Sequence, residues 1–262
     1  MFFSKFHITS LFVIMLLILA GAGVYFNGYA PWWIGVIILI YLGMIVLGSI
    51  FIRWNFYFRS QVMLDLETNS PSLHIRQNSG KVALTFDDGP AAYTETILNI
   101  LKEEQAAATF FVIGKNISGQ ESVLKRMVAE GHTIGNHSYA HGRGFDWKSS
   151  TEMAREIMQT NVEIERVTGK KTTLFRPPYG VTNPNLAKAV KQTGMKSIGW
   201  NIRSLDTTAQ SEERLLRRIL ERLRPGAIIL LHDRCAITAK ILPRLIKEIY
   251  KRGFVLETLS RQ

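Results

Sequence analysis

Two adjacent aspartates and a pair of histidines are the residues of this sequence whose types and spacing can do chemistry. Asp87 and Asp88 stand in the segment 85–90 (Thr-Phe-Asp-Asp-Gly-Pro), directly after an apolar run, and His137 and His141 follow with the spacing i, i+4. Two imidazoles and one carboxylate leave open positions on a metal ion, which is typical of a catalytic rather than a structural site. The other carboxylate is then free to act as a base towards an activated water. The set predicts metal-assisted hydrolysis.

The elements that must position these residues alternate along the chain. We expect strands at 82–86, 108–113, 133–135, 173–175, 197–200, 227–231 and 254–256, and helices at 94–105, 121–130, 151–168, 184–192, 212–223 and 239–251. Ser149 and Glu152 have the spacing of a capping box, and the glycines at 131, 169, 194 and 253 are suited to end helices. Pro243 is awkward inside the last helix and is expected to mark a first turn. The alternation predicts a parallel sheet, either open or closed into a barrel.

The polar motifs follow the expected strands. The two aspartates follow the first strand, His137 the third, the segment 176–180 (Arg-Pro-Pro-Tyr-Gly) the fourth, and His232 with Asp233 the sixth. In both kinds of parallel sheet the active site lies at the carboxyl ends of the strands. These separate segments are therefore expected to meet on one face.

Two long apolar runs precede this region, at about 8–26 and 32–52. Each is long enough to cross a bilayer, and residues 27–31 form a polar break between them. The sequence thus predicts a transmembrane helical hairpin within residues 1–59, a juxtamembrane linker at 60–80, a catalytic domain at 81–262, and membrane lipids as partners. The alternative is a cleavable signal peptide that ends near Ala20-Gly21-Ala22.

The chain is basic, with 32 lysines and arginines against 21 acidic residues among 262. This balance suits contact with anionic lipid headgroups or an anionic envelope polymer, and it also suits a merely soluble surface. We expect no nucleic-acid partner, because no basic run is interleaved with stacking aromatics. Cys235 is the only cysteine, which excludes an internal disulfide.

Taken together, the motifs resemble those of the polysaccharide deacetylase family, carbohydrate esterase family 4, whose catalytic unit is the NodB-homology domain. Segments 85–90, 137–141 and 176–180 are similar to its first three motifs, and 230–232 (Leu-Leu-His) to its fifth. The resemblance covers roughly 81–259. It implies a distorted (β/α) barrel of about seven parallel strands. It also implies hydrolysis of the N-acetyl or another N-acyl amide of an amino sugar, in a cell-envelope glycan or its precursor.

The resemblance also implies the roles of individual residues. Asp88, His137 and His141 would hold a divalent metal, with zinc the default and cobalt or another divalent ion compatible. Asp87 would be the general base, and His232 the general acid that protonates the departing amine. A further histidine, His132, lies nearby but is not needed as a ligand, and we expect it to be structural.

Supporting roles follow from the third and fifth motifs. Arg176 would orient Asp87 through a charge-assisted hydrogen bond. The backbone N–H of Tyr179, held by the rigid turn at Pro178, would point at the oxyanion. Leu230 lies in the strand that leads to His232.

The fourth motif departs from the family pattern. Aligned on Trp200, the chain has Arg203 in place of the aspartate that supports the catalytic histidine in relatives, retains Asp206, and has Thr207 in place of a tryptophan. A cation near His232 would lower its pKa. Either Arg203 points away from the imidazole, or another carboxylate such as Asp206 or Asp233 replaces the missing one.

Substrate and topology stay open at this point. Lys5, Arg53 and Arg59 flank the two apolar runs, and the positive-inside tendency favours both ends in the cytoplasm, where a lipid-linked sugar is the better substrate. The outward orientation, facing a finished glycan, is the alternative. A glycan-binding module with an impaired acid step is the rival from another functional class.

Overall fold

The computed structural model describes residues 4–28, 31–64 and 80–259. The helices are α1 (Lys5–Asn27), α2 (Trp32–Ile50), α3 (Thr94–Glu103), α4 (Glu121–Ala129), α5 (Ser150–Thr168), α6 (Pro184–Thr193), α7 (Glu212–Leu220) and α8 (Ala236–Lys251). The strands are β1 (Lys81–Gly89), β2 (Thr109–Val112), β3 (Thr133–Asn136), β4 (Leu174–Phe175), β5 (Lys196–Ser197), β6 (Ile202–Arg203), β7 (Ile228–His232) and β8 (Val255–Leu256).

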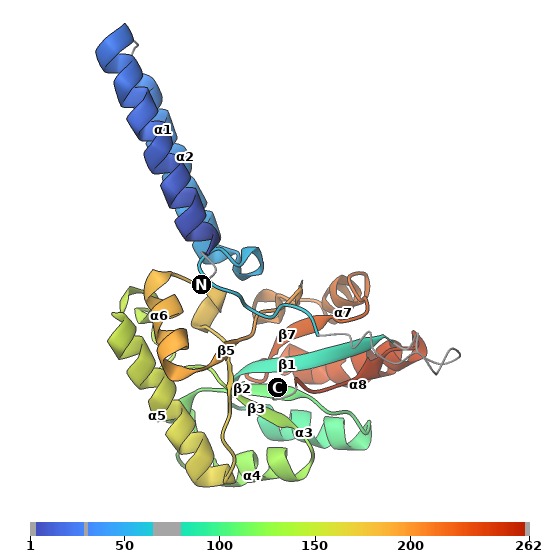
Figure 1. Ribbon diagram of the computed structural model, residues 1–262. Coiled ribbons are helices and arrows are strands. Elements are labelled where there is room, and N and C mark those ends of the chain that lie inside the picture. Colours follow the sequence, from blue (N-terminus) through green and yellow to red (C-terminus); the bar gives the residue numbers. More distant parts are fainter. Residues whose placement is uncertain (1–3, 29–30, 65–79, 260–262) are drawn as a thin grey trace, which may run out of the picture.

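Seven of the described strands form a parallel sheet in the order β5-β4-β3-β2-β1-β7-β6. The sheet curls into a half-barrel in which β1 lies between β2 and β7, and β8 pairs with the start of β1 (Figure 1). In register, Phe86 of β1 lies beside Phe110 of β2 and Leu231 of β7. The predicted parallel, barrel-like sheet of about seven strands is confirmed.

One strand prediction was wrong in detail. The expected strand at 197–200 is divided, because β5 ends at Ser197 and the chain then crosses to the opposite edge of the sheet, where β6 begins at Ile202. Each piece has only two residues, which is too short to show an alternating pattern in the sequence. Trp200 of the crossing segment is buried in the same cluster as Ile198 and Leu230.

The alternation of side chains along β1 separates the core from the site. Val82, Leu84 and Phe86 pack against the helices in the main core, whereas Ala83 belongs to a smaller cluster inside the half-barrel. Because side chains of a strand alternate between its two faces, Asp87 shares the inner face with Ala83. The strand thus sends its apolar residues outward to the helices and delivers the carboxylate inward.

Local signals fixed several helix boundaries. Ser149 caps α5 in a capping box with Glu152, and Gly169 and Gly194 end α5 and α6 in the left-handed conformation. Pro243, in contrast, lies inside α8 rather than in its first turn. The helix begins earlier because the N–H groups of Thr238 and Ala239 bond to the carbonyl of Cys235, and these contacts outweigh the hydrogen bond that a proline omits.

The two N-terminal helices form an antiparallel hairpin that projects away from the sheet (Figure 1). Their mean hydropathies are 2.3 and 2.5, and their side chains are largely exposed, so both could cross a membrane. The base of the hairpin contacts the rest of the chain, since Thr182 N–H donates to Ser49 O at 3.0 Å. Of the expected linker, Gln61 and Met63 bridge to the sheet region, and residues 65–79 lie outside the described residues.

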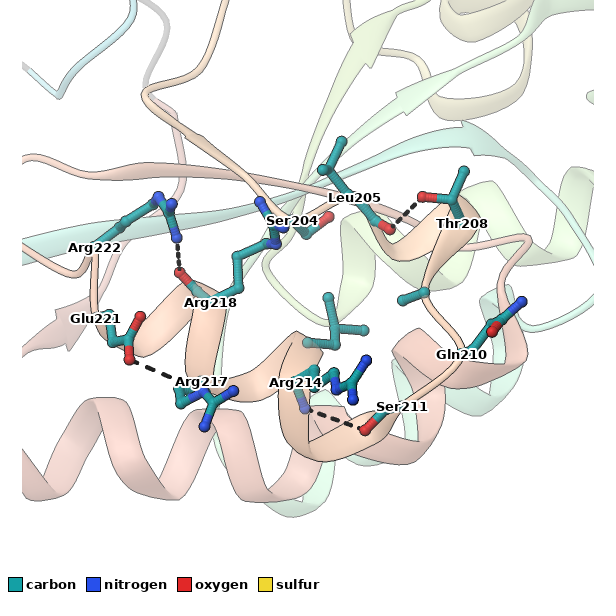
Figure 2. Close-up of a pocket in the computed structure, with 12 residues that line it drawn as sticks. Ser204, Leu205, Thr208, Gln210, Ser211, Arg214, Arg217, Arg218, Glu221 and Arg222 are labelled. Atoms are coloured by element: carbon teal, nitrogen blue, oxygen red, sulfur yellow. Dashed lines mark hydrogen bonds and ion pairs between the residues drawn. The ribbon is translucent and has the colours of Figure 1, made fainter.

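Arginines gather on the surface of α7, close to the base of the hairpin. Arg214, Arg217 and Arg218 border a groove of about 470 Å³, in which Arg217 pairs with Glu221 and Arg222 donates to the carbonyl of Arg218 (Figure 2). The lining of this groove is therefore rich in arginine, with Glu221 as its acidic residue.

Candidate active site

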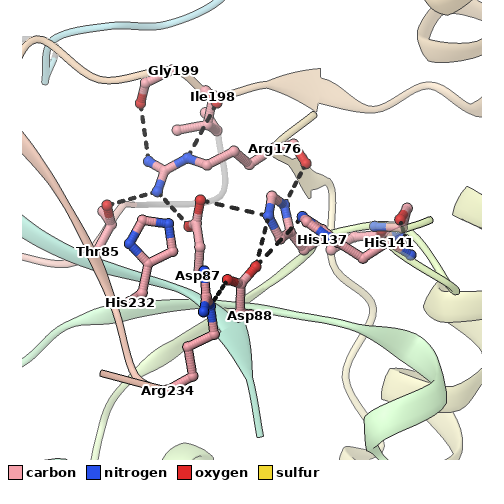
Figure 3. Close-up of polar contacts among 12 residues, drawn as sticks. Thr85, Asp87, Asp88, His137, His141, Arg176, Ile198, Gly199, His232 and Arg234 are labelled. Carbon is pink, nitrogen blue, oxygen red and sulfur yellow. Dashed lines mark hydrogen bonds and ion pairs between the residues drawn. The ribbon is translucent and has the colours of Figure 1, made fainter. Parts of the chain in front are cut away.

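Three candidate ligands converge at the carboxyl ends of β1 and β3 (Figure 3). Asp88 Oδ1 lies 3.6 Å from His137 Nε2 and 3.4 Å from His141 Nε2. Ligand bonds to zinc are about 2 Å long, so atoms around one ion lie up to about 4 Å apart. The distances and the donor types fit a divalent metal, with space for further ligands.

Hydrogen bonds set the orientation of the two imidazoles. His137 Nδ1 lies 2.8 Å from the carbonyl of Arg176, which can only accept, so Nδ1 carries the proton and Nε2 offers its lone pair. The backbone N–H of His141 donates to Ser138 Oγ, which fixes the chain at this residue. Burial lowers the pKa of His141 to about 4. The charge of His137 also lowers this pKa, and the charges of Asp88 and Asp87 raise it by less. Neutral imidazole is the form that binds metals.

Asp87 is held by the most deeply buried cation of the described chain. Arg176 is completely buried, and its Nη1 donates to Asp87 Oδ1 and to Thr85 Oγ1, each at 2.7 Å. Its Nη2 donates to Gly199 O at 3.0 Å. The free oxygen of Asp87 lies 3.6 Å from His137 Nε2, at the edge of the ligand cluster. This arrangement keeps one carboxylate oxygen paired and aims the other at the site.

His232 is supported by Asp206 at the end of β7. Asp206 Oδ1 lies 2.8 Å from His232 Nδ1, and Oδ2 accepts from the backbone N–H of His232 at 2.7 Å and from Thr238 Oγ1 at 2.6 Å. Burial of His232 disfavours its cation, but the hydrogen bond and charge of Asp206, together with the two site aspartates, outweigh it and raise the pKa. Arg203 is exposed and no described carboxylate pairs with it.

The other carboxylate considered from the sequence, Asp233, is not the partner of His232. Its Oδ2 accepts from Thr94 Oγ1 at 2.6 Å, and burial raises its pKa to about 7. Asp206 therefore supplies the support for His232, although Arg203 occupies the aspartate position of the family motif.

The third motif forms a short 3₁₀ turn, η4 (Pro178–Gly180). Tyr179 adopts a left-handed conformation with φ of 58°, and its ring lies 4.7 Å from that of His141. Gly180 is needed beside it, because φ is +70° and a Cβ atom would lie 2.2 Å from the ring of Trp200. Pro178 is buried in the turn and Leu230 in β7. The turn places Tyr179 at the edge of the ligand cluster.

All of the predicted reacting residues line one cavity of about 150 Å³. It contains Asp87, Asp88, His137, His141, Tyr179, Leu230 and His232, together with Gly180, Trp200, Arg203, Leu205, Thr207 and Arg234. A larger groove of about 680 Å³ continues from it past Lys115 and Asn116 and shares Asp88, His141 and Tyr179. The residues of this cavity therefore lie at one end of an open groove that suits an extended ligand.

Sequence reasoning missed Arg234. Its Nε donates to Asp88 Oδ2 at 2.6 Å, which leaves the other oxygen of Asp88 facing the two histidines. The only available signal was its position two residues after His232. His132, as expected, is outside the cavity, where its Nδ1 accepts from the N–H of Ala108.

Comparisons with known proteins agree with this geometry. Residues 74–198 match the family model described as polysaccharide deacetylase. The chain is 32% identical to a chitooligosaccharide deacetylase of Azorhizobium caulinodans over 201 residues, which are 71% of this chain and 95% of that protein. It is also 32% identical to the peptidoglycan-N-acetylmuramic acid deacetylase PdaA of Bacillus subtilis over 184 residues, which are 68% of this chain and 70% of that one.

A solved structure is similar in fold as well as in sequence. The peptidoglycan deacetylase PdaC from Bacillus subtilis superposes with a TM-score of 0.65 at 34% identity, over 70% of this chain and 89% of that chain. A family 4 carbohydrate esterase from Streptomyces lividans in complex with acetate has a TM-score of 0.65 at 32% identity, over 69% and 93% of the two chains.

Proposed function

Because the chain belongs to the polysaccharide deacetylase family, carbohydrate esterase family 4, we propose that it is a metal-dependent hydrolase that removes the acetyl group from an N-acetylated amino sugar of a cell-envelope glycan or glycan precursor. Sugar N-deacetylation is the activity shared by the named relatives. The observation that carries the proposal is the convergence of Asp88, His137 and His141 in one cavity with Asp87 and His232.

The ligand cluster suits a divalent ion, with zinc the default and cobalt also compatible. Asp88, His137 and His141 would hold it. Such an ion polarises an acyl carbonyl and favours the ionisation of water. Arg234 and the carbonyl of Arg176 orient Asp88 and His137, so these two ligands need little rearrangement to bind.

Asp87 is placed to accept the proton of the attacking water. Its Oδ1 is engaged by Arg176 at 2.7 Å, which leaves Oδ2 as the oxygen that faces the site. The buried guanidinium stabilises the carboxylate form and fixes its direction, as a general base requires. The backbone N–H of Tyr179, in the proline-bounded turn, would donate to the oxyanion that forms.

His232 is placed to protonate the amine as the amide bond breaks. A general acid near neutral pH needs a pKa that keeps it partly protonated, and Asp206 raises the pKa of His232 despite burial. The hydrogen bond to Nδ1 leaves Nε2 as the nitrogen that delivers the proton. This support removes the reason to favour a binding module with an impaired acid step.

The two apolar helices of the hairpin support a membrane anchor for the catalytic region. Cell fractionation tests this part of the proposal. We expect the intact chain in the membrane fraction after an alkaline wash, with the mass of the uncleaved protein. A shorter soluble product that begins after residue 22 would instead indicate a signal peptide. Protease accessibility on intact cells would then identify the side that the catalytic region faces.

Acetate release by the full chain in detergent tests the proposed chemistry. The substrates are N-acetylglucosamine oligomers and peptidoglycan fragments, offered to metal-free protein and then with added Zn²⁺ or Co²⁺. We expect metal-dependent release that Asp87→Asn lowers by about 10³-fold while it still binds metal, because general base catalysis contributes on this order. Undiminished release by that variant would overturn the mechanism.

A further inference from the structure

A second cavity lies between the end of α2 and the catalytic cavity. Its volume is about 340 Å³, and its lining comes from the hairpin end (Ile50, Phe51, Ile52, Arg53), the segment after β5 (Trp200, Asn201, Arg203, Leu205) and the region of α7 (Arg218, Arg222). We call it the hairpin pocket. No step of the proposed reaction uses it, so its composition needs a separate explanation.

The charge of the hairpin pocket is of one sign. Among the described residues, its lining holds four arginines and no aspartate or glutamate. All four arginines are exposed, and no described carboxylate pairs with Arg53, Arg203 or Arg218. Arg222 donates only to the backbone carbonyl of Arg218. Clustered guanidinium groups repel one another, and an anion with several oxygens relieves this repulsion through charge-assisted hydrogen bonds.

The hairpin pocket shares a wall with the catalytic cavity. Trp200, Arg203 and Leu205 line both. The wall is held on the hairpin side, because Trp200 and Ile52 belong to one buried apolar cluster. A ligand that fills the hairpin pocket therefore lies next to the reacting groups, with Arg203 between the two spaces.

The other wall of the pocket belongs to the end of an apolar helix. Ile50 and Phe51 are exposed at the point where α2 meets the rest of the chain. If α2 spans the bilayer, a lipid lying along it has its headgroup at this level. The apolar wall and the arginines thus match the two parts of a lipid phosphate, its chain and its anion.

Resting on the proposed deacetylation and on the hairpin as a membrane anchor, we propose that the hairpin pocket binds the phosphate of a lipid-linked N-acylated amino sugar, and that this lipid is the substrate. In a 2-acylamino sugar joined to a lipid through a phosphate at C1, the phosphate and the amide are on adjacent carbons. Arg203 lines both cavities, so its guanidinium is available to such a phosphate when the amide is at the ligand cluster. The departure of Arg203 from the family motif then has a function, while Asp206 continues to support His232.

A pair of substrates that differ only in the phosphate tests the proposal on the full chain. The protein is placed in nanodiscs of zwitterionic lipid with zinc, and offered a prenyl-phosphate-linked N-acetylglucosamine or the prenyl glycoside of the same sugar. We expect kcat/KM to be about tenfold higher with the phosphate, as one charge-assisted contact provides. Equal kcat/KM for the two would overturn the proposal.

Variants of the pocket arginines test whether the preference for the phosphate substrate arises in the hairpin pocket. Arg222→Gln should raise KM for the phosphate substrate about tenfold and leave the neutral glycoside unchanged. Arg203 also lines the catalytic cavity, so Arg203→Gln should raise KM for the phosphate substrate about tenfold more than KM for the neutral glycoside. Arg217→Gln is the matched control, because Arg217 is exposed on α7, pairs with Glu221 and does not line the hairpin pocket. An equal loss on both substrates, or the same loss in the control, would overturn the assignment of the pocket.

A binding measurement separates this proposal from the proposed activity. Full-length Asp87→Asn in nanodiscs is titrated with prenyl phosphate, with phosphatidylglycerol and with inorganic phosphate, and the fluorescence of its tryptophans, including Trp200, is followed. The proposal is supported if prenyl phosphate binds tightly, the other two ligands do not, and Arg203→Gln weakens the binding of prenyl phosphate. Equal binding of phosphatidylglycerol would overturn the substrate assignment in favour of a general headgroup site. The unsubstituted chain is assayed for hydrolysis of the sugar amide in parallel. If it hydrolyses none while prenyl phosphate still binds, the proposed activity is refuted and the phosphate site is retained.

Discussion

Asp206 Oδ1 and His232 Nδ1 lie 2.8 Å apart, and Asp206 also accepts the backbone N–H of His232 through its second oxygen. One buried carboxylate therefore fixes both the ring and the backbone of the proposed general acid. Thr238, at the start of α8, and Ser204 hold the carboxylate in turn. The support for His232 is complete without the aspartate that Arg203 replaces.

Asp206→Asn should move the alkaline limb of the pH–rate profile to lower pH. The pKa of His232 in the folded chain is raised above its ordinary value of about 6.5, so activity that needs the imidazolium is lost as pH rises through that raised pKa. Without the charge of Asp206, burial lowers the pKa and the loss comes earlier. The measurement is kcat/KM from pH 5 to 10. Thr208→Ala is the control, because Thr208 lies with Asp206 in the 3₁₀ turn η5 (Asp206–Thr208). An unshifted limb would exclude His232 as the titrating acid.

The same pair should contribute to stability in a definite pH window. A raised histidine pKa stabilises the fold fully below its unfolded value of about 6.5, and this contribution disappears as pH rises through the folded value. Asp206→Asn should therefore lower the Tm more at pH 5.5 than at pH 9. Loss of an acceptor for the hydroxyl of Thr238 or the N–H of His232 adds about 1–3 kcal/mol at every pH. Differential scanning calorimetry checks both parts, and a Tm loss that grows with pH would contradict the first.

His141→Ala should remove the metal without unfolding the chain. One of three protein ligands is lost, so we expect metal affinity to fall by more than about 100-fold, the upper end of what loss of a supporting partner costs. Equilibrium dialysis with Zn²⁺ measures it. His132→Gln is the matched control, because His132 is buried but accepts from Ala108 rather than facing the ligands. A control variant that lost its metal would place the site elsewhere.

Arg176→Met should destabilise the protein more than it alters metal binding. It leaves Asp87 buried without its guanidinium, and breaking such a pair costs about 3–5 kcal/mol. The second substitution Asp87→Asn should restore part of this loss, since it removes the unpaired charge. Thermal unfolding of the single and double variants in detergent measures the recovery. If the double variant were no more stable than Arg176→Met, the cost would lie in packing rather than in the charge.

Arg234→Gln should weaken metal binding while leaving stability nearly unchanged. The Arg234 side chain is 53% exposed, so water screens its repulsion of a bound cation, and its hydrogen bond to Asp88 is the larger effect. We expect about tenfold weaker binding, in the range for partners that orient a ligand. Arg234→Lys, which keeps the charge, should recover part of the affinity. A tighter metal complex in Arg234→Gln would mean that repulsion dominates.

Much of the fold was readable because its signals are local. The capping box at Ser149 and Glu152, the C-terminal glycines 169 and 194, and the strand at 82–86 depend on a few neighbouring residues. The division of the expected strand at 197–200 was not readable, because pairing of β5 with β4 and of β6 with β7 is decided by distant partners. Pro243 in α8 was misjudged for another reason, since that helix begins at Ala236, where the N–H groups of Thr238 and Ala239 bond to the Cys235 carbonyl.

The sequence by itself determined that Asp87, Asp88, His137 and His232 would meet on one face, because parallel strands align their carboxyl ends and these residues follow those ends. Only the tertiary structure decided which carboxylate supports His232, that Arg234 holds Asp88, and that the hairpin end and Arg203 border one pocket. These are contacts between side chains far apart in the chain. Their geometry depends on how the sheet curls and where each loop returns, which no local pattern of residue types encodes.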